Sequence, residues 1–152
     1  MIIMDKLFKK ILVATDGSSC SRTAVSYGVH LAKLAGAGLI AVYVVDLKTG
    51  CGLEQCISIT TPKAAALMKL HQRGERAVKY VEDVASKEGV SVDKRVVEGH
   101  PAEEIIKLAR DESVDLIVMG TLGLSGIKKY LLGSTADKVV RHSRVPVMTV
   151  RK

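Results

Sequence analysis

Glycine and hydroxyl residues gather near the end of the sequence in a pattern suited to binding an anion. Gly120 and Gly123 carry no side chain, so the backbone N–H groups around them can approach a phosphate closely. Gly133, Ser134 and Thr135 stand where a helix is predicted to begin, and the free N–H groups and dipole of a helix N-terminus attract anions. The pattern predicts a phosphate site, and the alternative is that these glycines simply form turns.

The positive charge of the chain lies mostly around these glycines. The chain has 23 basic and 16 acidic residues, a net charge of +7. Residues 120–152 hold seven lysines and arginines against one acid, Asp137, so +6 of that charge falls in the last fifth of the chain. Lys128 and Lys129 stand inside the glycine-rich segment itself. This potential favours anionic ligands.

A second segment suited to a binding site follows the first apolar run. It covers residues 14–18 and reads ATDGS. Ser18 or Ser19 can cap the helix predicted next, because a hydroxyl accepts a hydrogen bond from an unpaired helical N–H. In doubly wound α/β sheets, ligands bind at the carboxyl ends of strands where the strand order reverses, and both segments are expected there.

The elements that position these segments alternate between strand and helix. Short apolar runs bounded by turn residues predict strands at 9–15, 39–45, 90–97, 116–119 and from Val145 to Val150. Helices are predicted from Ser18 or Ser19 to about Gly36, over 62–89, from Pro101 onward and over 134–142. In the first helix the apolar positions at helical spacing are Ala24, Tyr27 or Gly28, Leu31, and Leu34 or Ala35.

This alternation predicts parallel strands, right-handed crossovers and helices on both faces of one sheet. The length of 152 residues predicts a single domain over 1–152. No apolar stretch reaches the ~20 residues that span a bilayer, and the N-terminus is too short and too soon charged for a signal peptide. We therefore expect a cytoplasmic protein with no membrane partner.

The composition argues against some classes of function. Aromatic residues make up 3% of the chain and Trp is absent, which argues against base-stacking platforms for nucleic acids, and no DNA partner is expected. The three cysteines form no disulfide framework. Cys51 and Cys56 leave a redox disulfide or a metal site open, whereas Cys20 is interpreted as a small buried residue. The absence of Asn is a thermophile tendency, which the Cys and Met content weakens.

The spacing Gly120-x2-Gly123-x9-Gly133-Ser134 resembles that of the ATP-binding universal stress proteins. The resemblance extends along nearly the whole chain. It includes ILVATDGS at 11–18, VYVVD at 42–46, GHPAEEI at 99–105, DLIVMGTLG at 115–123 and VPVMTVR at 145–151. Several motifs in the right order over one domain are a specific signal, which the glycine spacing alone is not.

The resemblance implies a flavodoxin-like α/β fold, like that of adenine nucleotide alpha hydrolases. Its five-stranded parallel sheet has the order 3-2-1-4-5. It also implies ATP as ligand, with Mg²⁺ or Mn²⁺. By position, the resemblance implies that Ala14, Thr15 and Asp16 would lie beside the nucleotide and that the Val44 backbone would contact adenine. Met119 and Gly120 would flank the ribose and phosphates. The phosphates would be held by Gly123, Gly133, Ser134 and Thr135.

Asp16 has two possible roles. It could bond the ribose or help position the divalent cation, since a carboxylate beside a polyphosphate needs such a partner to offset like-charge repulsion. The alternative is that Asp16 caps the first helix.

The expected function is that of a nucleotide-dependent switch or sensor in the stress response, acting through a protein partner not identified by the sequence. The chain has no G-x-x-x-x-G-K-[ST] loop and no evident base for water attack, so at most slow ATP hydrolysis is expected. The alternative is an enzyme that uses ATP for adenylation or phosphorylation. A weaker third hypothesis is binding of RNA or a membrane surface by the basic C-terminal region.

The last strand, from Val145 to Val150, is apolar. If it lies at the sheet edge, pairing with the same strand of a second copy would cover it. The family resemblance implies such a contact, and a homodimer is predicted.

Overall fold

The computed structural model describes residues 6–48, 61–122 and 132–152. The strands are β1 Lys10–Ala14, β2 Gly38–Asp46, β3 Val92–Gly99, β4 Leu116–Gly120 and β5 Val147–Val150. The helices are α1 Ser19–Ala35, α2 Thr61–Lys87, α3 Pro101–Asp111 and α4 Ser134–His142. No helix in these three ranges is long and apolar enough to cross a membrane.

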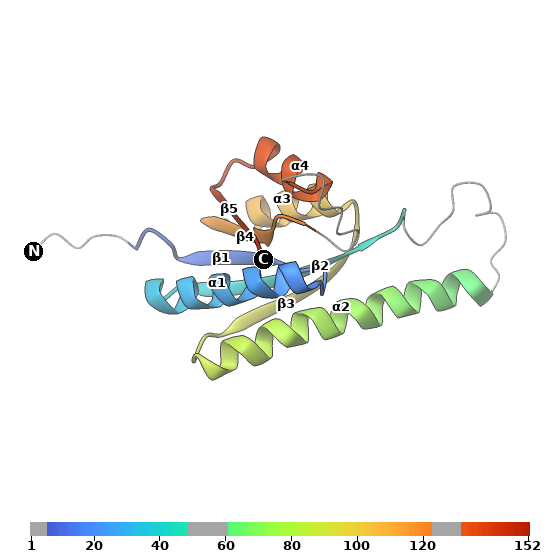
Figure 1. Cartoon of the computed structure of the whole chain (residues 1–152), viewed down its shortest axis with the longest axis horizontal. Coiled ribbons are helices and arrows are strands. Elements are labelled where there is room, and N and C mark those ends of the chain that lie inside the picture. Colours follow the sequence, from blue (N-terminus) through green and yellow to red (C-terminus); the bar gives the residue numbers. More distant parts are fainter. Residues whose placement is uncertain (1–5, 49–60, 123–131) are drawn as a thin grey trace, which may run out of the picture.

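The five strands form one parallel sheet in the order β3-β2-β1-β4-β5 (Figure 1). Val13 of β1 pairs with Ala41 of β2 on one side and with Val118 of β4 on the other. The chain builds outward from β1 to β3 and then crosses back to β4, so the order reverses between β1 and β4. This confirms the expected fold class and strand order, and it makes the carboxyl ends of β1 and β4 the place to look for a site.

Alternate strand residues pack into two apolar layers. On one face, Ile11, Val13 and Val118 pack under α1 and α2. On the other face, Leu12 and Ile117 pack under α3 and α4. Successive side chains of a strand point to opposite faces, which is why these buried strands are apolar without interruption. Figure 1 shows the two helical layers on either side of the sheet, as predicted.

The ends of α1 follow the predicted signals. Ser18 is the N-cap, and its Oγ accepts a hydrogen bond from the Ser21 N–H at 3.2 Å. At the other end, Gly36 has a left-handed φ of +61° and donates its N–H to carbonyls of the last turn. Of the two serines proposed as caps, Ser18 has this role.

The buried face of α1 differs from part of the prediction. Tyr27 is 55% exposed and Leu34 is 85% exposed, whereas Gly28 is buried. The packed stripe consists of small or β-branched residues: Ser21, Ala24, Val25, Gly28, Val29 and Ala32. A small-residue face allows the helix to approach the sheet closely. Tyr27 and Leu34 were therefore the wrong markers, whereas Leu31 and Ala35 pack against the core as predicted.

Two strand starts differ from prediction by two residues. β3 begins at Val92 rather than at residue 90, and β5 begins at Val147 rather than at Val145. The Val145 N–H donates to the Ser143 Oγ at 3.1 Å, so a local turn takes the place of strand pairing there. β5 nevertheless lies at the sheet edge, as its predicted role requires.

Candidate functional site

A cavity of about 430 Å³ lies at the carboxyl ends of β1, β2 and β4. Nine of the ten predicted site residues line it: Ala14, Thr15, Asp16, Val44, Met119, Gly120, Gly133, Ser134 and Thr135. The tenth, Gly123, lies outside the described residues, as do Lys128, Lys129, Cys51 and Cys56. Parallel strands end at the same edge of the sheet, which is how residues more than 100 positions apart come to share one cavity.

The turn after β1 is held by its own hydroxyl and carboxylate groups. The Thr15 N–H donates to the Val42 carbonyl at 3.0 Å, and the Thr15 Oγ1 lies 3.1 Å from the Ser21 Oγ. The Ser18 N–H donates to the Asp16 Oδ1 at 2.9 Å. Asp16 therefore orders the turn that precedes the N-cap residue of α1. Ser18 caps α1, so the alternative that Asp16 caps this helix is wrong.

Gly120 allows the end of β4 to lie against the first turn of α1. A Cβ at Gly120 would lie 3.0 Å from the Cys20 Sγ and 3.2 Å from the Cys20 carbonyl carbon. Cys20 is 7% exposed, as predicted for a small buried residue, and its Sγ lies 3.6 Å from the Val150 carbonyl oxygen. A side chain at Gly120 would therefore crowd Cys20, whatever the cavity binds.

The N-terminus of α4 opens onto the cavity. Gly133 is its N-cap, and no side chain of the described residues accepts a hydrogen bond there. The Gly133 N–H donates to the Thr121 carbonyl at 2.6 Å, which ties the start of α4 to the end of β4. The helix therefore presents its positive end and its free N–H groups, with the Ser134 and Thr135 hydroxyls, to an anionic ligand.

The backbone N–H and C=O of Val44 are placed to form hydrogen bonds with a ligand in the cavity. The ladder between β1 and β2 ends where the Thr15 N–H donates to the Val42 carbonyl. β2 continues to Asp46 beside β3, so its last residues have lost their neighbour on the β1 side. Val44 is two residues beyond Val42, and its N–H and C=O therefore point the same way, toward the space that β1 has left.

Several lining residues were not predicted from the sequence. Tyr43 and Asp46 come from β2, Leu70 and Arg73 from α2, and Pro101 and Ile105 from α3. Tyr43 is 5% exposed, and burial raises the pKa of its hydroxyl; the Arg73 charge opposes this and the Asp16 charge adds to it. No spacing in the sequence distinguishes Arg73 from the other exposed basic residues of this helix.

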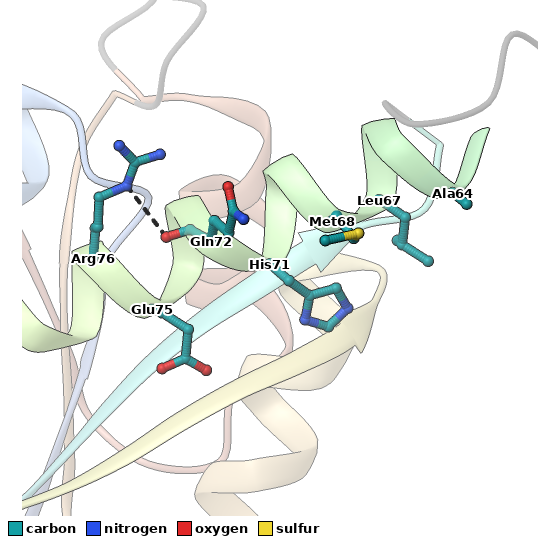
Figure 2. Close-up of a pocket in the computed structure, with 7 residues that line it drawn as sticks. All are labelled: Ala64, Leu67, Met68, His71, Gln72, Glu75 and Arg76. Atoms are coloured by element: carbon teal, nitrogen blue, oxygen red, sulfur yellow. Dashed lines mark hydrogen bonds between the residues drawn. The ribbon is translucent and has the colours of Figure 1, made fainter. Parts of the chain in front are cut away.

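A second hollow, of about 770 Å³, lies over the first half of α2 (Figure 2). Its lining consists of Ala64, Leu67, Met68, His71, Gln72, Glu75 and Arg76. Among the described residues all of this lining comes from one helix, and no predicted site residue belongs to it. Because a ligand site needs polar groups that converge from several elements, the cavity at the strand ends is the candidate site.

The residues that the structure describes hold no group of three or more His, Cys, Asp or Glu side chains able to bind a metal ion. Asp16 is therefore a single carboxylate, with one oxygen engaged by the Ser18 N–H. A divalent cation there would need oxygens from a ligand, as expected of a cation bound together with phosphates.

The chain resembles proteins of one family over nearly its entire length. The sequence model of the universal stress protein family matches residues 7–151. The universal stress protein MJ0531 of Methanocaldococcus jannaschii is 37% identical over 148 residues, which cover 97% of this chain and 85% of that protein.

Solved structures of similar fold agree with these sequence matches. The hypothetical protein MJ0577, of the same organism, matches with a TM-score of 0.82 at 29% identity, covering 96% of this chain and 97% of that one. A universal stress protein in complex with cAMP matches with a TM-score of 0.71 at 26% identity, covering 95% and 97%. With a family match over almost all of its residues and a relative above 30% identity, this chain belongs to the universal stress protein family.

Proposed function

We propose that this protein binds ATP in the cavity at the strand ends and acts as a nucleotide-dependent switch or sensor in the stress response, with little or slow hydrolysis. One observation carries the proposal: nine residues chosen for nucleotide binding line a single cavity at the reversal of strand order. A universal stress protein that matches this chain was solved with cAMP, an adenine nucleotide, which supports the ligand class.

The walls of the cavity suit the two ends of such a ligand. Val42, Val44 and Ile105 offer an apolar surface for a base, and the free backbone edge at Val44 offers hydrogen bonds to it. Aromatic stacking is not needed for this mode. The N-terminus of α4, with Ser134 and Thr135, would hold phosphates. Gly123 belongs to the same proposal but lies outside the described residues.

Asp16 would help hold Mg²⁺ or Mn²⁺ together with phosphate oxygens. Phosphates beside a bare carboxylate repel it, and a divalent cation removes that repulsion. In this arrangement the Ser18 N–H keeps one carboxylate oxygen in place and leaves Oδ2 for the cation or a ribose hydroxyl.

Binding rather than turnover is the better supported activity. Hydrolysis needs a group that positions the attacking water, a metal and charge stabilisation. The carboxylates of the described lining are Asp16 and Asp46, and each already accepts a backbone N–H, from Ser18 and from Lys48. Within the described lining, the alternative, an ATP-using enzyme, would need one of these two carboxylates to act as a base.

Calorimetric titration of the purified protein with ATP, with and without Mg²⁺, tests the proposal. We expect saturable binding that Mg²⁺ strengthens. We also expect ATP to be hydrolysed to ADP more slowly than bound nucleotide exchanges with free nucleotide. An absence of binding to any adenine nucleotide would overturn the site assignment, and rapid metal-dependent release of ADP would favour the enzyme.

We also propose that the protein is a homodimer through β5. The two edge strands of the sheet differ in how they are protected. β3 carries Asp93, Lys94 and Glu98, which discourage edge pairing, whereas β5 reads VMTV and has no charge. Two copies of β5 related by a two-fold axis would cover each other.

A further inference from the structure

Arg73 brings a positive charge to the cavity from the side opposite α4. α2 packs in one helical layer and α4 in the other, and the cavity is lined from both. The charged groups of the described lining are Asp16, Asp46 and Arg73, two negative and one positive. An anionic ligand therefore meets one guanidinium among carboxylates, and that guanidinium stands across the cavity from the positive end of a helix.

The position of Arg73 is set by the residue next to it. A Cβ at Gly74 would lie 2.7 Å from the Tyr43 Cδ1 and 2.9 Å from the Val96 Cγ1. α2 thus lies close against β2 and β3 at this turn, which is the turn that carries Arg73 to the cavity edge. Tyr43 and Arg73 both line the cavity, and although burial raises the pKa of the Tyr43 hydroxyl, the Arg73 charge acts to lower it.

The Arg73 guanidinium makes no hydrogen bond or ion pair with the residues that the structure describes. Two other arginines of the chain are engaged: the Arg76 Nε donates to the Gln72 carbonyl at 3.3 Å (Figure 2), and Arg95 binds the Asp93 carboxylate at 2.7 Å. An arginine that reaches a cavity with its donors unused is available to a ligand in that cavity.

We propose that Arg73 is a nucleotide-binding residue that contacts the phosphate chain from the α2 side, opposite the N-terminus of α4. This inference rests on the proposed function. A guanidinium has five donors in a planar fork that matches two phosphate oxygens, and such charge-assisted bonds are about twice as strong as neutral ones. Arg73 would also offset the repulsion between the phosphates and the two carboxylates of the lining.

The test compares Arg73→Gln with Arg76→Gln by calorimetry against ATP, ADP, AMP and adenosine. Both changes remove one positive charge from α2, but Arg76 lies three residues on and lines the other hollow. We expect Arg73→Gln to weaken ATP and ADP binding by about tenfold and adenosine binding by less than about twofold. Arg76→Gln should match the parent protein.

Three results would overturn the inference. Equal ATP affinity for the two variants would mean that Arg73 makes no ligand contact. An equal loss for adenosine and ATP would place the contact on the nucleoside. A parent protein that binds no adenine nucleotide would overturn the proposed function as well, whereas the first two results leave that function standing.

Arg73→Lys separates charge from geometry. Lysine keeps the charge but lacks the fork, so we expect it to recover part of the ATP affinity and none of the two-point contact. Thermal melting of each variant checks the fold, and because the Arg73 side chain is exposed, we expect melting temperatures close to that of the parent.

Discussion

The packing of α1 on β1 can be tested with a single methyl group at Gly28. A Cβ at this position would lie 2.3 Å from the Val13 Cγ2. Because carbon atoms in contact lie about 3.5–4.0 Å apart, the helix or the valine has to move by more than about 1 Å. Val13 is fully buried and branched at Cβ, so it cannot turn aside freely.

The expected change in stability is a difference between two opposing effects. Overpacking a core costs about 1–3 kcal/mol, and the severity of this contact places Gly28→Ala at the upper end. Alanine returns about 1 kcal/mol, because it is the better helix former. The free energy of unfolding should therefore fall by about 2 kcal/mol, a drop of about 4–8 °C in Tm for a protein of this size.

Urea and thermal unfolding followed by circular dichroism measure this change. Gly38→Ala is the matched control, because a Cβ there meets only the Lys9 carbonyl oxygen at 3.8 Å, an ordinary contact. We expect the control to stay within about 0.5 kcal/mol of the parent. The sign of the change in the free energy of unfolding is the test. If Gly28→Ala is more stable than the parent, helix propensity alone explains the change, and the close approach of α1 to β1 is wrong.

Further predictions concern the site, the charges and the sheet edge. Asp16→Asn should leave ATP binding without Mg²⁺ nearly unchanged and remove most of the gain that Mg²⁺ gives, as titrations with and without the ion will show; an unchanged gain would exclude Asp16 as the cation ligand. Lys33 lowers the pKa of Glu88, and Lys94 and Lys79 lower that of Glu82, so these pairs stabilise the fold above pH 4.5, the ordinary glutamate value, and their contribution is lost as the pH falls below it. Melting temperatures of Glu88→Gln and the parent should therefore differ at pH 7 and converge at pH 3, and a difference that persists at pH 3 would contradict this. Thr149→Pro should halve the mass in sedimentation from twice 16.3 kDa, because the Thr149 N–H points away from β4 and only the pairing of two copies would use it; a dimer that survives would exclude the β5 interface.

The order of strands and helices could be predicted because the buried strands are apolar without interruption and turn residues separate them. Helix α4 begins and ends at the predicted residues, and Gly36 ends α1 as expected. The side of α1 that faces the sheet was harder to predict. Tyr27 and Leu34 look like core residues, but the helix turns its small residues inward because Gly28 allows it to lie against Val13.

The candidate site could be predicted where its residues end a strand or begin a helix. Asp16 and Gly120 follow buried strands, and Gly133 precedes a helix, so the topology alone brings them together. Arg73 is different, because it lies in the middle of α2. Its place at the cavity depends on how that helix is rotated about its axis, and this rotation depends on the contact of Gly74 with Tyr43, which no pattern in the sequence shows.

The glycine spacing that first suggested phosphate binding has two separate physical causes. Gly120 is favoured by packing, because a side chain there would crowd Cys20, and its contact with the Cys20 backbone carbonyl would remain even if the Cys20 side chain were changed. A loss of ATP binding in a Gly120 variant would therefore not by itself distinguish a disturbed packing of β4 against α1 from a lost ligand contact. Gly133 is different, because it caps a helix whose N–H groups face the cavity. The start of α4, and Arg73 across from it, are therefore the positions where substitution separates a ligand contact from a packing requirement.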